Sequence, residues 1–228
     1  MSVLQQQLKL SQPYIDYSPA KHLLWRIESL VGHTLYRRPP PKAGAHPPLL
    51  HLGCGGEKFD GWVNADFYNF HDLLRNRRFV PDWMLDLTRP IRCPDGYWDG
   101  VFTEHTLEHL TYDECFFALA EVHRMLRDGA WVRVVVPDIA KYVAYYLGDP
   151  PDERFKRLPK GPEAISNVTQ CWGHKSVWDG QLLCSVLREI GYSNVREVAF
   201  NEGSDGRLVK DSAERAWESL YVEGQRPT

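Results

Sequence analysis

The sequence predicts an α/β domain built on an open, mostly parallel sheet of about seven strands, with helices on both faces. From Leu49 onward, short apolar segments of strand length alternate with segments of helical periodicity, the pattern of a parallel sheet with crossover helices. One segment, "WVRVVVP", is a β-branched run typical of a strand buried on both faces. With 228 residues, of which 43% are hydrophobic and 25% charged, the chain can bury a core of this kind.

Two parts of the chain differ in composition. Residues 1–47 are predicted to form an N-terminal helix and a proline-rich linker, and residues 48–228 the main domain. Ser18 and Pro19 suit an N-cap and a first helical position. Apolar residues then recur at helical spacing until about Tyr36, where "RRPPPKAGAHPP" contains too much proline for a helix to continue.

The strands of the main domain are expected at "LLHL", "GWVNAD", "DWMLDL", "WDGVFTE", "WVRVVVP", "NVREVAF" and "ESLYVEG". Helices are expected from Thr111 to Gly129, where Thr111 and Glu114 have capping-box spacing, and after Asp138 and Asp179, which suit N-caps. The polar, proline-bearing stretch of residues 148–167 is predicted to be a loop.

Charge and cysteine content exclude several classes of function. The formal net charge of -3 gives no general attraction to nucleic acid or to an anionic membrane, and no segment has the ~20 apolar residues of a membrane span. Five scattered cysteines without a Cys-x-x-Cys pair suggest reduced thiols in a cytoplasmic protein. Two basic clusters are interpreted as solvated surface: Arg75, Arg77 and Arg78; and Arg154, Lys156, Arg157 and Lys160.

A glycine turn, "GCGG", follows the first predicted strand, and Asp66 ends the second. A dinucleotide fold needs G-x-G-x-x-G, and a phosphate loop needs G-x-x-x-x-G-K-[ST]. Lys58 stands at the required glycine in both patterns. A nucleoside without a phosphate needs only a tight turn and a carboxylate that accepts from the ribose hydroxyls. Gly53, Gly55 and Asp66 fit this third use.

Here the chain resembles the class I S-adenosylmethionine-dependent methyltransferases. "LHLGCG", "NADF" and "LDL" look like the motifs of their first three strands. "DGVFTEHTLEHL" and "VHRMLRDGAWVRVVVPD" are similar to their fourth and fifth strands. Within this family the chain resembles the small predicted methyltransferases associated with surface-glycan and secondary-metabolite pathways. The resemblance covers nearly all of residues 49–224 and implies a Rossmann-like sheet whose last strand, "ESLYVEG", is antiparallel.

One departure concerns the connection between the first two strands. Asp66 follows Gly53 by 13 positions, whereas the acid usually follows the glycines by about 20 residues, with a helix between. The first helix is therefore expected to be lost or collapsed, with Phe59 or Trp62 from the resulting loop against the ligand.

The resemblance assigns the site residues. S-adenosylmethionine is expected to contact Gly53, Cys54, Gly55, Asp66, Asp86, Leu87 and Glu104, with Cys54 packing inward and Asp86 equally able to cap a turn. His105 and His109 are the predicted catalytic residues, since histidine suits proton removal near neutral pH. Asp138 could face the substrate, although helix capping also explains it. Trp172 and His174 lie in a region that can close over a substrate.

A metal ion is not expected from the sequence. His105 and His109 have H-x-x-x-H spacing, but Glu104 and Glu108 are displaced from the H-E-x-x-H pattern. The resemblance implies methyl transfer to a small-molecule or glycan-like acceptor, at a hydroxyl. Two alternatives remain: a non-catalytic S-adenosylmethionine-binding or scaffold protein, and a nicotinamide-dependent oxidoreductase, which Lys58 and the short spacing disfavour.

Overall fold

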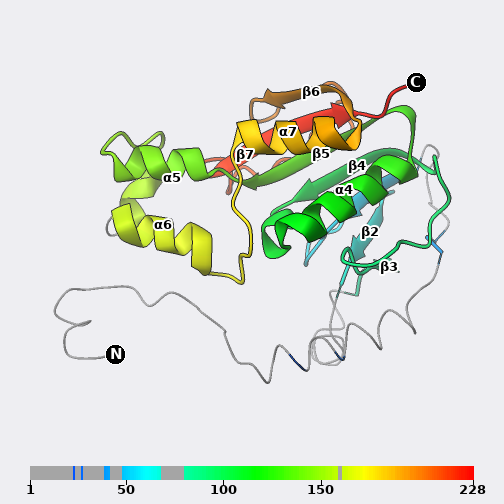
Figure 1. The fold of residues 1–228 in the computed structure, drawn as a ribbon, viewed down its shortest axis with the longest axis horizontal. Coiled ribbons are helices and arrows are strands. Elements are labelled where there is room, and N and C mark those ends of the chain that lie inside the picture. The colour runs from blue at the N-terminus through cyan, green and yellow to red at the C-terminus, as the bar shows by residue number, and fades with distance from the viewer. Residues whose placement is uncertain (1–22, 24–26, 28–38, 42–47, 68–79, 159–160) are drawn as a thin grey trace.

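The computed structural model describes residues 23, 27, 39–41, 48–67, 80–158 and 161–228 (Figure 1). Apart from these few positions, the predicted N-terminal helix and proline-rich linker lie outside the described residues, as do Arg75, Arg77, Arg78 and Lys160. The division at residue 47 therefore stays a prediction. No helix in the described part of the chain is long and apolar enough to cross a membrane, and all five cysteines are free and buried.

The main domain is built on a seven-stranded sheet in the order β3-β2-β1-β4-β5-β7-β6. Neighbouring strands from β3 to β5 are parallel, whereas β7 is antiparallel to both β5 and β6. This order and the reversed last strand confirm the predicted fold class, a Rossmann-like open sheet. The strands are β1 (Leu49–Leu52), β2 (Val63–Asp66), β3 (Trp83–Met84), β4 (Trp98–Glu104), β5 (Leu126–Pro137), β6 (Ser193–Val198) and β7 (Ser219–Gln225).

One face of the sheet carries the main hydrophobic core, which α4 (Tyr112–Met125) and α7 (Gly180–Ile190) cover (Figure 1). The predicted helix starts are confirmed. Thr111 and Glu114 form a capping box, and Asp179 accepts a hydrogen bond from the backbone of Leu182 at the start of α7. Asp138 likewise caps α5 (Ile139–Tyr146), so capping explains this aspartate.

The end of α4 differs from the prediction. The sequence predicts a helix that ends just before Gly129, the expected C′ glycine, but the helix ends at Met125 and β5 begins at once with Leu126. Leu126 is fully buried and pairs with Trp98 of β4. Burial and strand pairing of this residue outweigh the helical pattern around it. Gly129, with φ of 78°, instead lies within the irregular first part of β5.

The segment after Gly148 is also more ordered than predicted. It contains a 3-10 turn, η3 (Glu153–Arg157), and a helix, α6 (Gly161–Gln170), where a loop was expected. Ala164 and Val168 of α6 pack with Tyr142 of α5 and Phe155 of η3 in a second core cluster. The helix is stabilised by this burial, which a polar and proline-bearing sequence does not reveal. In Figure 1, α5 and α6 lie together beside one end of the sheet.

The connection between β1 and β2 contains turns and no helix, as the short spacing predicted. Phe59 and Trp62, which were candidates for contact with the ligand, do not line the pocket at the ends of these strands. Phe59 stacks on His51 with ring centroids 4.3 Å apart, and Phe59 and Trp62 both pack against a third cluster that contains Phe102 and Tyr221. Burial of these aromatic rings in that cluster holds them away from the glycine turn.

A buried ion pair fastens the segment between β6 and β7 to the sheet. The Arg133 guanidinium on β5 donates to both carboxylate oxygens of Asp211, at 2.6 and 2.5 Å, and to the carbonyl of Glu202. The Arg133 and Asp211 side chains are only 1% and 0% exposed. A bidentate pair with additional hydrogen bonds is the arrangement in which attraction offsets the cost of dehydrating two charges.

We expect Asp211→Asn to lower the free energy of unfolding by about 3–5 kcal/mol, because it leaves the buried guanidinium without a counter-charge. Denaturant unfolding measures the change. Glu153→Gln is the control, since the pair of Glu153 with Lys156 is largely exposed and its loss should change stability by about 1 kcal/mol at most. Equal effects of the two substitutions would contradict this interpretation.

Candidate functional site

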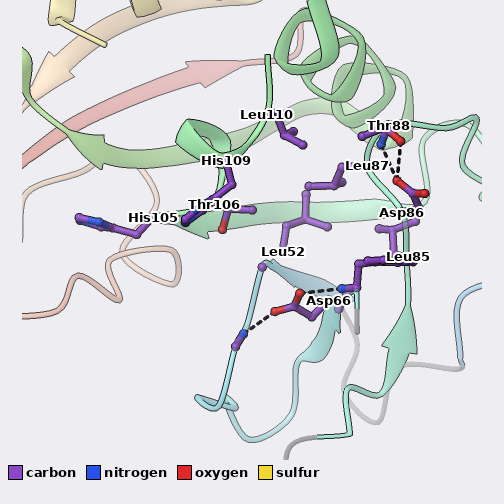
Figure 2. Close-up of a pocket in the computed structure, with 14 residues that line it drawn as sticks. Leu52, Asp66, Leu85, Asp86, Leu87, Thr88, His105, Thr106, His109 and Leu110 are labelled. Carbon is purple, nitrogen blue, oxygen red and sulfur yellow. Dashed lines mark hydrogen bonds between the residues drawn. The ribbon is translucent and has the colours of Figure 1, made fainter. Parts of the chain in front are cut away.

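A pocket of about 320 Å³ opens at the carboxyl ends of the central strands, where open α/β sheets bind ligands. Its volume lies at the lower end of the range for small-molecule sites. Figure 2 shows how its side chains converge from four strand ends. The lining residues are Leu52, Gly53, Gly55, Ala65, Asp66, Phe67, Leu85, Asp86, Leu87, Thr88, His105, Thr106, His109 and Leu110.

The glycine turn forms one wall of this pocket. Gly53 and Gly55 have φ of 68° and 52°, a left-handed conformation that costs side-chain-bearing residues energy. The amides of Gly53 and Cys54 both donate to the carbonyl of Ala65 on β2, at 2.9 and 3.1 Å. A Cβ atom on Gly53 would lie 1.9 Å from Oγ1 of Thr106, whereas one on Gly55 would meet no atom within 4 Å. Gly53 is therefore required by conformation and by space, and Gly55 by conformation alone.

Asp66 ends β2 with its carboxylate on the same pocket (Figure 2). Oδ2 accepts from the amide of Gly55 and Oδ1 from the amide of Phe67, both at 2.6 Å. Burial raises the pKa of Asp66, and these two backbone donors oppose the rise. Each carboxylate oxygen can accept a further hydrogen bond. The side chain is thus fixed in place and still able to receive two donors from a ligand.

Asp86 and Leu87 follow β3 and also line the pocket. Oδ1 of Asp86 accepts from the amide and the hydroxyl of Thr88, at 2.9 and 2.7 Å (Figure 2). Arg89 approaches Oδ2 of the same carboxylate at 3.5 Å. Asp86 therefore caps the turn that places Leu87 in the pocket, which is the alternative role considered for it.

Two predicted cofactor contacts do not line the pocket. The Cys54 side chain is buried, and burial raises the pKa of its thiol to about 12, so it packs inward as expected for an inert cysteine. The Glu104 carboxylate instead accepts a hydrogen bond from the amide of Ser212 at 3.1 Å.

Lys58, at the position of the missing third glycine, donates to Asp82 at 2.8 Å.

His105 lies beyond the end of β4 with an unusual φ of 48°. Its Nε2 is 2.9 Å from Oγ of Ser219, and that hydroxyl donates to the carbonyl of Arg215 at 2.8 Å. Because a hydroxyl has one proton, Nε2 has to donate to Ser219. Nδ1 faces the Glu108 carboxylate at 3.3 Å. Both ring nitrogens are engaged, so the predicted role of His105 as a base does not suit its geometry.

His109 ends the 3-10 turn η2 (Leu107–His109) and faces the ring of His174, with centroids 5.0 Å apart. Burial lowers the pKa of His109, although the negative charge of Glu108 opposes this. Burial also disfavours the charged form of Glu108, but the close contact with His105 and the charges of His105 and His109 lower the Glu108 pKa on balance. The structure therefore brings together an ionised carboxylate and three histidines.

A second pocket of about 590 Å³ adjoins the first, because His105 and His109 line both. Sequence reasoning had marked only the two predicted histidines, Trp172 and His174 in this region. Glu108 lies between these two histidines in the sequence, and the remaining lining residues come from three segments distant from it, which no local motif links: Pro137 and Tyr142; Leu158, Asn167 and Val168; and Arg215, Trp217 and Glu218.

No protein-family model matches the chain, and no curated protein matches its sequence. A Haloferax volcanii methyltransferase, solved with the activator Trm112, has 14% identity and a TM-score of 0.49 over 96% of this chain and 100% of its own. A SAM-dependent methyltransferase from Archaeoglobus fulgidus has 13% identity and a TM-score of 0.45, and the match covers 98% of each chain.

A third similar structure, the CurJ carbon methyltransferase, has 14% identity and a TM-score of 0.48 over 94% of this chain. The present chain spans only 57% of that protein's length. With TM-scores below 0.5, these similarities carry no argument about the activity of this chain, which has to rest on its own residues.

We expect Gly53→Ala to destabilise the fold more than Gly55→Ala. Both substitutions put an alanine in the left-handed region, at a cost of about 1–2 kcal/mol. Only Gly53→Ala also collides with Thr106, which adds about 1–3 kcal/mol of overpacking. Chemical denaturation of the two variants measures the difference, and equal losses would show that Thr106 does not hold the turn.

Proposed function

We propose that this chain is a class I S-adenosylmethionine-dependent methyltransferase. The observation that carries the proposal is the pairing of the Gly53–Gly55 turn with the Asp66 carboxylate in one pocket, across a connection too short for a helix. This is the combination that a nucleoside without a phosphate requires. The resemblance in sequence motifs and the antiparallel β7 within the sheet support the same family.

The charge of the first pocket supports this cofactor over a dinucleotide. Among the described residues that line it, none is lysine or arginine, and Asp66 contributes a carboxylate. A negative charge near the ligand repels a pyrophosphate and attracts the positive sulfonium of S-adenosylmethionine. In this proposal Asp66 accepts hydrogen bonds from the ribose hydroxyls, and apolar side chains contact the adenine ring: Leu52, Leu85, Leu87 and Leu110.

The second pocket is proposed to hold the methyl acceptor. Trp172 and Trp217 offer flat aromatic surface, and Tyr142, Arg215 and Glu218 offer polar groups. Such a lining suits a small-molecule or glycan-like acceptor with hydroxyl groups, because sugars and related rings present an apolar face and polar edges. His109 stands where the two pockets meet, so the acceptor hydroxyl and the methyl group are expected to meet there.

S-adenosylmethionine supplies a methyl group on a sulfonium, a good neutral leaving group, for in-line displacement. The residues of this chain therefore need mainly to align the acceptor oxygen with the methyl carbon at ~3 Å and to exclude water. The glycine turn and Asp66 fix one partner. His105, held between Glu108 and Ser219, is proposed to keep the junction rigid and so to orient His109.

Two other functions would use parts of the same site. A non-catalytic S-adenosylmethionine-binding or scaffold protein needs the first pocket alone, and the adjoining second pocket favours an enzyme over it. A nicotinamide-dependent oxidoreductase needs room for a pyrophosphate at the third glycine position, where Lys58 is instead paired with Asp82.

Calorimetric titration of the full chain with S-adenosylmethionine, its demethylated product and NADH tests the proposal. Saturable binding of the first two and none of NADH is expected. We expect Asp66→Ala to weaken S-adenosylmethionine binding by about 1.5–3 kcal/mol, the value of charge-assisted hydrogen bonds, while Asp60→Ala, in the exposed part of the same connection, leaves it unchanged. No binding of S-adenosylmethionine by the folded protein would refute the proposed function.

Binding should also depend on pH through Asp66. Because burial raises the pKa of this carboxyl, it becomes protonated at a higher pH than an ordinary aspartate, and a neutral carboxyl accepts the ribose hydroxyls less well. Affinity should therefore be full at neutral pH and fall as pH decreases through the raised pKa. A calorimetric pH series checks this. The weak residual binding of Asp66→Ala should lack that pH dependence.

A further inference from the structure

The carboxylate of Glu108 is the most unusual polar group of the junction between the two pockets. Its side chain is only 2% exposed, and neither oxygen receives a hydrogen bond of good geometry. Nδ1 of His105 lies 3.3 Å from Oε1 of Glu108 in an ion-pair contact, and this ring faces only that one oxygen of the carboxylate. A buried charge with unused lone pairs is costly unless a further positive partner satisfies them.

His174 approaches Glu108 from a different segment of the chain. The amides of Lys175 and Ser176 donate to the carbonyl of Glu108, at 2.7 and 3.2 Å, which holds this segment against η2. Nδ1 of His174 lies 2.8 Å from the carbonyl of Val168, so Nδ1 carries the proton. In the neutral form of this ring Nε2 presents a lone pair, and it lies 4.0 Å from Oε1 of Glu108.

His109 completes the group in a similar manner. Its ring has a hydrogen bond with the backbone of Gly173, which leaves the other ring nitrogen available. One ligand atom each from Glu108, His109 and His174 lies within 4.8 Å of the other two. Two histidines that each donate to a backbone carbonyl, beside an unsatisfied carboxylate, match the second-shell pattern of protein metal ligands.

We propose that Glu108, His109 and His174 bind a divalent transition-metal ion at the junction of the two pockets. Two imidazoles and one carboxylate are the ligands of a catalytic zinc site that keeps a position open. Nitrogen ligands favour zinc, cobalt or iron over magnesium and calcium. Bonds of about 2.0–2.2 Å require the three ligand atoms, which lie within 4.8 Å of one another, to move closer together when the ion binds.

The ion's role in catalysis rests on the proposed methyltransferase function. A divalent cation here faces the acceptor pocket, which Glu108, His109 and His174 all line. Contact with the cation lowers the pKa of an acceptor hydroxyl, whose proton is lost to water. The oxygen then forms a bond to the methyl carbon as the carbon–sulfur bond breaks, and the electron pair of that bond remains on sulfur. His109 serves as a ligand in this scheme, and His105 orients Glu108.

Metal binding can be measured without any methyl acceptor. Tag-free full-length protein is stripped with a chelator and titrated with Co²⁺, whose visible absorption reports histidine coordination, and then with Zn²⁺ in a calorimeter. We expect saturable binding of about one ion per chain, with Zn²⁺ displacing Co²⁺. Absence of saturable binding by the folded protein would overturn the proposal and leave the cluster as a charge-compensated His–Glu network.

The variants are chosen to keep the fold. His174→Asn retains a side-chain N–H for the carbonyl of Val168 but removes the Nε2 ligand, and Glu108→Gln keeps the shape and removes the charge. Each should weaken binding by about 100-fold or more, since loss of a second-shell partner alone costs up to about that much. His123→Ala is the matched control, because His123 packs on Tyr192, outside the cluster. Unchanged metal affinity in both ligand variants would contradict the assignment.

Cofactor titrations separate the two proposals. His174→Asn should lose the metal and still bind S-adenosylmethionine, because His174 does not line the first pocket, whereas Asp66→Ala should bind metal normally. A wild-type protein that binds the cofactor but no metal would overturn the metal site alone. One that binds metal but not the cofactor would overturn the proposed function and leave the metal site intact.

Discussion

The close contact between the backbone of Gly53 and Thr106 is the constraint on which the site depends. No side chain fits between them, so the turn after β1 and the segment after β4 lie directly against each other. The hydrogen bonds of Gly53 and Cys54 with the carbonyl of Ala65 add the end of β2 to the same point. Three strand ends are thereby joined, with Asp66 on one side of the contact and the histidines on the other.

The short connection between β1 and β2 follows from this arrangement. A helix there would normally cover the sheet beside the turn. Here Phe59 and Trp62 pack with Phe102 and Tyr221 in a separate cluster, and Asn64 accepts a hydrogen bond from the amide of Phe59 at 2.9 Å. The packing of these aromatic rings holds the connection between β1 and β2 against the sheet, as a helix at this position would otherwise do. The glycine turn keeps its position although the element that usually follows it is absent from the described connection.

Local patterns in the sequence were sufficient for much of the fold. The capping residues Thr111, Asp138 and Asp179 each begin the helix they predicted, because a cap depends on atoms within a few residues. The end of α4 and the existence of α6 could not be predicted in this way. Both depend on burial against distant partners, Trp98 for Leu126 and Tyr142 for Val168.

The two pockets differ in the same way: local sequence patterns predict much of the first, whereas the second depends on contacts between distant segments. The first pocket is built from residues directly after parallel strands, so the order of motifs was enough to place Gly53, Asp66 and Leu87 together. Its exceptions, Cys54 and Glu104, follow from the direction of the side chain, which a motif does not specify. In the second pocket, the segment of His174 meets η2 through the hydrogen bonds of Lys175 and Ser176 with Glu108, and Arg215 comes from a third part of the chain.

Charge links the two proposals. Asp66 lines the first pocket and Glu108 the second, and burial favours the neutral form of both carboxylates. Asp66 has backbone donors on both oxygens, and a cationic cofactor adds a positive partner. Glu108 has no comparable donors, and the His105 ring faces only one of its oxygens. A metal ion between Glu108, His109 and His174 would supply the missing positive charge where the acceptor oxygen has to lose its proton. The polar groups of the junction are then satisfied when both the cofactor and the cation are bound.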